Sequence, residues 1–140
     1  MQILLIAGGW SSEREVSLAG AAIIRQALVV LGHDVRFLDP AESFHDLTAE
    51  AARTDFAFLN LHGSPGEDGL IQAILDAARV PYQGTGPSGS LLALNKAAAK
   101  QIFHSCGLLT PPWEFLPRPP APSFTPRFAP PYLVKPNQGG

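Results

Sequence analysis

An apolar run changes abruptly into a polar loop in the segment FAFLNLHGSPGEDG, which spans residues 56–69. Residues 56–60 have the composition of a strand that is covered on both faces of a parallel sheet. Three glycines and one proline then exclude regular structure from a loop that holds His62, Glu67 and Asp68. Ligands of open α/β sheets bind beyond the carboxyl ends of the strands. The segment therefore predicts a buried strand and, directly after it, a candidate functional site.

Strand and helix signals alternate on both sides of this segment. Strands are predicted at residues 3–7, 33–38, 56–60 and 132–136, with a short extended piece at 80–82. Helices are predicted over residues 13–31, around 47–53, over 70–78 and, with Asn95 as the cap, over 96–106. A flexible loop is expected at residues 83–90. The alternation predicts an α/β fold with a mostly parallel sheet, helices on both faces, and the second strand beside the first.

The charge balance and the cysteine content narrow the class of protein. Ten Lys and Arg against twelve Asp and Glu give a net charge of -2, so neither nucleic acid nor a membrane surface is an expected partner. The first apolar segment ends at Gly8, too early for a signal peptide or a membrane span. The single cysteine, Cys106, suits a reducing cytoplasm, and we interpret it as a small core residue.

Three loops are expected to meet at one rim of the sheet, because right-handed crossovers place the connections after parallel strands on the same side. These loops span residues 8–15, 62–69 and 84–90. The N-termini of the helices that follow favour a carboxylate or a phosphate. The side chain of Glu13 can pair with an ammonium group. A zwitterionic amino acid would satisfy both demands.

The residues alone leave other interpretations open. A dinucleotide site would use Gly8, Gly9 and Asp39, but the required third glycine is absent and Glu13 and Glu15 stand where pyrophosphate would approach. A hydrolytic triad of Ser11 or Ser12 with His62 and Asp68 lacks a strained elbow around the serine. No His and Cys spacing indicates a metal site. Glu67 and Asp68 could simply cap a helix, and Lys96, Lys100 and Lys135 could be solvated surface charges.

Four motifs, in order and at matching spacing, resemble the D-alanine-D-alanine ligase family. They are GGWSSEREVSL at residues 8–18, NLHG with GEDG at 60–63 and 66–69, PY with GTG at 81–82 and 84–86, and VKP at 134–136. The resemblance covers the whole chain, although family members are roughly twice as long and have three domains. It implies a Rossmann-like pre-ATP-grasp domain over residues 1–110, a proline-rich linker over 111–131, and the truncated start of an ATP-grasp central domain over 132–140.

The resemblance also implies an activity. It is the ATP-dependent ligation of two D-alanines through an acylphosphate, in the synthesis of peptidoglycan precursors. It implies D-alanine and ATP as partners, Mg²⁺ with ligands beyond Gly140, a homodimer formed through the N-terminal domain, and a 140-residue chain that is inactive alone. A D-alanine-D-lactate type of ligase, a non-catalytic folding or dimerisation fragment, and a dinucleotide-binding domain remain alternatives.

Site residues follow from the same motif matches. Glu13 and His62 are implied as catalytic residues, with Ser11 and Ser12 joining them around the first D-alanine. Lys96 and Lys135 are implied as ATP-contacting lysines that neutralise phosphate charge. Asn95 departs from the family pattern, in which an aspartate commonly precedes the lysine.

Overall fold

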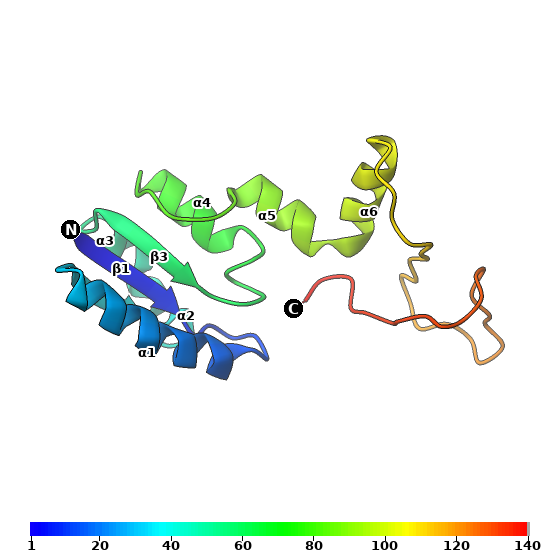
Figure 1. Cartoon of the computed structure of the whole chain (residues 1–140), viewed down its shortest axis with the longest axis horizontal. Coiled ribbons are helices and arrows are strands. Elements are labelled where there is room, and N and C mark those ends of the chain that lie inside the picture. Colours follow the sequence, from blue (N-terminus) through cyan, green and yellow to red (C-terminus); the bar gives the residue numbers. More distant parts are fainter. Residues whose placement is uncertain (140) are drawn as a thin grey trace.

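β1 (Gln2–Ala7) is the central strand of a three-stranded parallel sheet, with β2 (Asp34–Leu38) on one side and β3 (Phe56–Asn60) on the other. The computed structural model describes residues 1–139, and Figure 1 shows helices covering both faces of this sheet. An isolated parallel bridge between Ala57 and Tyr82 lies at the predicted extended piece. The predicted fold class and the pairing of the second strand with the first are therefore confirmed.

One face of the sheet is covered by α1 (Arg14–Val30). Side chains alternate along a strand, so Leu5 and Ala7 of β1 point to this face while Leu4 and Ile6 point to the other. The core on the α1 side consists of Leu5, Ala7, Ala21 and Val35, with Ile24, Leu28 and Phe58 packed against it. The helix therefore lies flat against the strands with its first turn at their carboxyl ends.

The opposite face is covered by α3 (Leu47–Ala51) and α4 (Leu70–Ala77). Two short elements, α2 (Pro40–Ser43) and the 3₁₀ helix η1 (Phe44–Asp46), lead from β2 into α3. The core on this side consists of Leu4, Ile6, Leu38, Leu47, Ala51, Ala57, Leu61, Ile71, Leu75 and Val80. The helix predicted around residues 47–53 thus corresponds to α3.

The last two helices, α5 (Pro87–Leu94) and α6 (Lys96–Ser105), lead away from the sheet (Figure 1). Asn95 caps α6 as predicted, because its side chain accepts a hydrogen bond from the Ala98 N–H. The predicted loop at residues 83–90 is too long, since α5 begins at Pro87, which is favourable at a first helical position. No helix among residues 1–139 is long and apolar enough to cross a membrane.

Two further predictions are wrong. Cys106 is exposed, because α6 does not pack on either core of the sheet. Residues 132–136 do not form a strand. Leu133 and Val134 are 85% and 90% exposed, and no strand among residues 1–139 pairs with them to satisfy their backbone hydrogen bonds.

The junction between α4 and α5 depends on a glycine. Gly69 has a φ of 89°, and a Cβ built on it would lie 2.4 Å from the carbonyl oxygen of Pro87. Gly32 has a similar φ of 82° but no atom within 4 Å of such a Cβ. We expect Gly32→Ala to lower the free energy of unfolding by about 1 kcal/mol through backbone strain alone, and Gly69→Ala by about 3 kcal/mol through strain and overlap. Urea denaturation followed by circular dichroism measures both, and equal losses would contradict the close contact.

Candidate functional site

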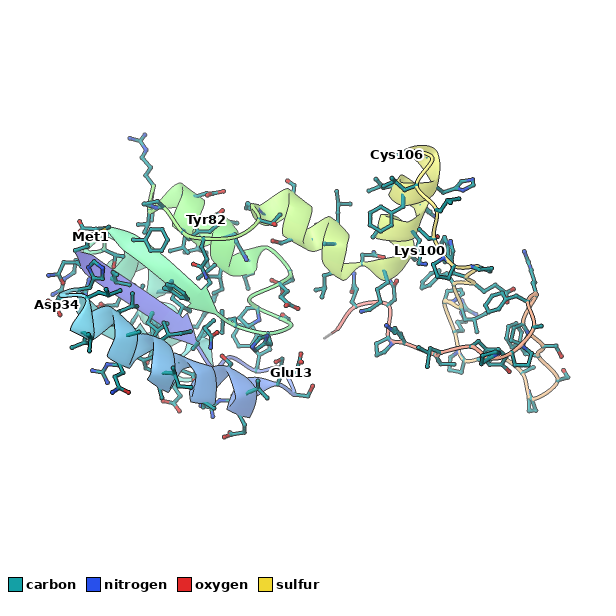
Figure 2. The ribbon with its side chains drawn as sticks, viewed as in Figure 1. Met1, Glu13, Asp34, Tyr82, Lys100 and Cys106 are labelled. Atoms are coloured by element: carbon teal, nitrogen blue, oxygen red, sulfur yellow. The ribbon has the colours of Figure 1, made fainter. Side chains whose placement is uncertain are left out.

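The loops after β1 and β3 meet at the carboxyl edge of the sheet. Figure 2 shows Glu13 at this edge, and Met1 and Asp34 at the opposite end. A Cβ built on Gly9 would lie 3.0 Å from Cδ of Pro65 and 3.3 Å from Cδ2 of Leu61, so the two loops are in close contact. Two of the three loops predicted to share a rim are therefore adjacent here. The third loop, residues 84–90, is joined to the second by the close contact between Gly69 and Pro87.

Ser17 and Asn60 fix the start of α1 against the end of β3. The Gly8 N–H donates to Oγ of the fully buried Ser17 at 2.7 Å, and the Ser17 hydroxyl donates to the Asn60 carbonyl. Asn60 Nδ2 in turn donates to the Ser17 carbonyl at 2.7 Å. A Cβ on Gly20 would lie 2.8 Å from Asn60 Nδ2, so a larger residue there would displace the Asn60 side chain from this hydrogen bond. The helix start therefore has a defined position relative to both strands.

Asp39 fixes the turn that follows β1. Its carboxylate accepts hydrogen bonds from the Gly9 N–H at 2.8 Å, the Ala41 N–H at 2.9 Å and Arg14 Nη2 at 2.5 Å. The Asp39 side chain is only 3% exposed, whereas Glu42, the outer partner of Arg14, is 71% exposed. The groups that a dinucleotide would need, the Gly8 and Gly9 amides and the Asp39 carboxylate, are thus already hydrogen-bonded within the protein.

Glu13 lies directly before α1, at the end of this turn. Its backbone N–H donates to Ser11 Oγ at 3.2 Å, which shapes the turn, and Ser12 beside it is exposed. The Glu13 carboxylate is half-buried and forms no ion pair or hydrogen bond within residues 1–139. Because Arg14 is engaged by Asp39, the negative charge of Glu13 is available to a cationic group of a ligand.

His62 comes two residues after the end of β3 and is half-buried. Its imidazole forms no hydrogen bond within the part of the chain that the structure describes. Glu67 and Asp68 instead stabilise the loop, and only Asp68 also contacts the first residue of α4, so the hypothesis that both cap a helix is not confirmed for Glu67. Glu67 accepts from the Gly63 N–H at 3.0 Å, and Asp68 accepts from Ser64 Oγ at 2.5 Å and the Leu70 N–H at 2.9 Å.

A cavity of about 480 Å³ lies between this loop and α5. Lys96 is the only one of the proposed site residues that lines it; Ser11, Ser12, Glu13, His62 and Lys135 lie outside. The buried Gln72 also lines the cavity. Its Nε2 donates to the Gly66 carbonyl at 2.5 Å, and its Oε1 has no partner within residues 1–139. The other lining residues are Leu59, Leu61, Gly66, Glu67, Gln83, Gly84, Thr85, Ser90, Ala93, Leu94 and Gly139.

The segment after α4 is held beside β3 by polar contacts. Gln83 accepts from the Leu59 N–H at 3.0 Å and donates to the Leu59 carbonyl at 2.5 Å. The Tyr82 hydroxyl donates to Asp76 at 2.9 Å. Burial raises the pKa of Tyr82 above its ordinary value of 10.0, and the hydrogen bond to Asp76 and its negative charge raise it further. Tyr82 is therefore a neutral hydrogen-bond donor, and these contacts keep the Gln83 end of the cavity in place.

The start of α6 contacts a segment far along the chain. Lys96 Nζ donates to the Gly139 carbonyl at 2.7 Å, and the Lys96 N–H donates to the Asn137 carbonyl at 3.0 Å. Lys135 is exposed and lies two residues before Asn137. The sequence alone does not predict this role of Asn137, because a residue so distant in sequence from α6 carries no local capping signal.

Magnesium was implied by the resemblance, with ligands beyond Gly140. Among residues 1–139 no group of three His, Cys, Asp or Glu side chains converges as metal ligands would. The described residues therefore do not fit a metal centre, and no metal-dependent step is assigned to them.

The family model and two of the curated proteins that this chain matches carry the description D-alanine-D-alanine ligase. Residues 39–85 match the family model described as D-ala D-ala ligase N-terminus. The whole chain is 61% identical to a D-alanine-D-alanine ligase of Nitratidesulfovibrio vulgaris and covers 46% of it. It is 59% identical, with the same coverage, to the corresponding ligase of Oleidesulfovibrio alaskensis. The chain thus spans about half the length of the curated relatives that it matches.

Solved structures agree in fold. A D-alanine-D-alanine ligase of Bacillus anthracis complexed with ATP has a TM-score of 0.74 and 33% identity, over 81% of this chain and 39% of that one. D-alanyl-alanine synthetase A of Vibrio cholerae has a TM-score of 0.71 and 29% identity, over 84% of this chain and 41% of that one. The arrangement of sheet and helices described above is shared with these proteins.

Proposed function

We propose, from the chain's relationship to the N-terminal part of the D-alanine-D-alanine ligase family, that it forms one side of the first D-alanine site in an ATP-dependent ligase. ATP phosphorylates the carboxylate of one D-alanine, and the amine of a second D-alanine attacks the acylphosphate and releases phosphate. The product would serve peptidoglycan precursor synthesis in the cytoplasm. The single observation that carries the proposal is the carboxylate of the half-buried Glu13, which has no partner among residues 1–139 at the carboxyl edge of the sheet.

Glu13 would bind the ammonium group of the first D-alanine. A charge-assisted hydrogen bond to a partly buried carboxylate is strong, and Arg14 does not compete for it because Asp39 engages Arg14. Ser11 and Ser12 would contact the same substrate from the turn before α1. His62, at the neighbouring strand end and without a hydrogen bond to its ring within residues 1–139, would orient the reacting carboxylate.

Lys96 and Lys135 would contact ATP and neutralise phosphate charge, which is the main contribution that a protein makes to phosphoryl transfer. Lys96 lies at the cavity beside the loop after β3, and its ammonium group contacts only a backbone carbonyl within residues 1–139. Among the described residues that ammonium group has no carboxylate partner, so it would not have to break an ion pair with them when it binds an anion. The ATP bound to the Bacillus anthracis ligase supports the same substrate here.

We propose the domain boundaries given by the resemblance: residues 1–110, 111–131 and 132–140. The exposed apolar residues of the two later segments support burial against further protein; Leu116, Leu133 and Val134 are 42%, 85% and 90% exposed. We also propose that α1 forms a homodimer contact. Val16, Ile23 and Val30 recur every seven residues on its outer side and are 64%, 73% and 80% exposed.

The test is a steady-state assay on the full-length protein that carries these residues. We expect ADP formation that depends on D-alanine, with D-alanyl-D-alanine identified by mass spectrometry, and no turnover from the isolated 140-residue chain. ADP formation that D-alanine does not stimulate would contradict the proposal. Adding D-lactate tests the alternative of a D-alanine-D-lactate type of ligase, because D-alanyl-D-lactate and D-alanyl-D-alanine differ in mass. Heat from specific binding of NAD, measured by calorimetric titration, would instead favour the dinucleotide alternative.

A further inference from the structure

Asn137 connects its segment to the start of α6 through both its backbone and its side chain. Its carbonyl accepts from the Lys96 N–H at 3.0 Å, and its Oδ1 accepts from the Ala97 N–H at 2.9 Å. Its Nδ2 donates to Oδ1 of Asn95 at 3.0 Å, and that same oxygen accepts from the Ala98 N–H at 3.1 Å. Every polar atom of the Asn137 side chain is therefore used to hold two segments together that are 42 residues apart in the sequence.

These contacts use the backbone donors at the start of α6. The first amides of a helix have no partner within the helix and often bind anions. Here the amides of Lys96, Ala97 and Ala98 donate to Asn137 and Asn95. An anion that approaches this end of α6 would thus meet the ammonium group of Lys96 instead of free backbone amides.

The same contacts determine how far apart Lys96 and Lys135 are. Two residues of extended chain span at most about 7 Å, so the backbone of Lys135 lies within that distance of Asn137. Lys96 is hydrogen-bonded directly to Asn137. The contacts of Asn137, together with the hydrogen bond from Lys96 Nζ to the Gly139 carbonyl, therefore keep the backbones of Lys96 and Lys135 close enough for both side chains to reach one polyphosphate.

We propose that Asn137 is a positioning residue for ATP: it does not touch the nucleotide, and it keeps Lys96 and Lys135 together so that both can bind the phosphates. This inference rests on the proposed ligase function. It predicts that the side chain of Asn137 affects ATP and leaves D-alanine unaffected, because Glu13 and His62 are held by the separate contacts of Ser17, Asn60 and Asp39.

The experiment compares Asn137→Ala with the wild type in the full-length enzyme. Loss of two hydrogen bonds is expected to raise the KM for ATP about tenfold, while the KM for D-alanine stays within about twofold. Gln138→Ala is the matched control, because this exposed neighbour makes no side-chain hydrogen bond within residues 1–139, and both constants should be unchanged. Calorimetric titration with a non-hydrolysable ATP analogue should show the same tenfold loss without turnover.

A double-mutant cycle with Asn95→Ala separates this role from a general loss of stability. Since Asn95 and Asn137 are hydrogen-bonded to each other, their effects on the KM for ATP should be less than additive. An unchanged KM for ATP in active Asn137→Ala enzyme, or an equal rise in the KM values for ATP and D-alanine, would overturn this inference but leave the proposed function standing. A wild-type enzyme without D-alanine-dependent turnover would instead overturn the proposed function and, with it, this role of Asn137.

Discussion

Replacing Glu13 by glutamine in the full-length enzyme is expected to raise the KM for D-alanine about a hundredfold. The amide is nearly the same size as the carboxylate but carries no charge, so the ammonium group of the substrate would be left without its counter-ion in a half-buried site. Losing one partner of such a charge pair costs roughly 2–5 kcal/mol. The KM for ATP should change little, because the proposed ATP contacts come from α6 and the segment before Asn137.

Glu15→Gln is the matched control for this change. Glu15 lies on the same first turn of α1, but its side chain is 89% exposed and only approaches Arg14 at 3.6 Å. Removing its charge alters the field at the helix start by a similar amount, yet it removes no proposed substrate contact. Steady-state kinetics with D-alanine as the varied substrate measure both variants. A Glu13→Gln enzyme with the wild-type KM, or equal effects of the two changes, would show that Glu13 does not bind the ammonium group.

Asp39→Ala is expected to lower the free energy of unfolding of the chain by about 4 kcal/mol. The buried carboxylate is the common acceptor for Gly9, Ala41 and Arg14, so its loss leaves the buried Gly9 N–H unpaired and leaves the Arg14 guanidinium with exposed carboxylate partners only. Breaking a buried ion pair by removing one partner typically costs 3–5 kcal/mol. Urea denaturation followed by circular dichroism would measure the change.

Glu42→Ala removes the other carboxylate that contacts Arg14 and is the control. Its side chain is 71% exposed, so its loss should cost less than about 1 kcal/mol. If both variants lost the same small amount, the pairing of Arg14 with Asp39 would contribute no more than a surface ion pair. A large loss for Asp39 alone would confirm that the turn carrying Glu13 is held in place from β2.

Local signals were sufficient for much of the fold. The apolar runs of β1 and β3 and the Asn95 cap of α6 depend on neighbouring residues in the sequence, and each was predicted from them. The loop formed by Glu67 and Asp68 is likewise closed by groups within a few residues. Contacts between residues that are only a few positions apart depend on their spacing in the sequence, and that spacing can be read from a single sequence.

Contacts between distant segments could not be predicted in the same way. Asp39 was considered as a ribose-binding residue, although the pair Asp39-Pro40 is a typical start of a short helix and indicated its capping role. No spacing rule joins Ser17 to Asn60 or Asn95 to Asn137, since each pair depends on the path of the whole chain. Cys106 and residues 132–136 were mispredicted because apolar composition predicts burial without indicating what covers the residue.

The hydrogen bond between Asn95 and Asn137 also closes a long loop that contains the proline-rich stretch. The conformational entropy lost on closing a loop grows only with the logarithm of its length, so doubling its length costs about 0.6 kcal/mol. Two ends that are hydrogen-bonded to each other do not move apart when residues are added or removed between them. We therefore expect that residues 111–131 can change in length and composition at little thermodynamic cost, while Lys96 and Lys135 stay close together.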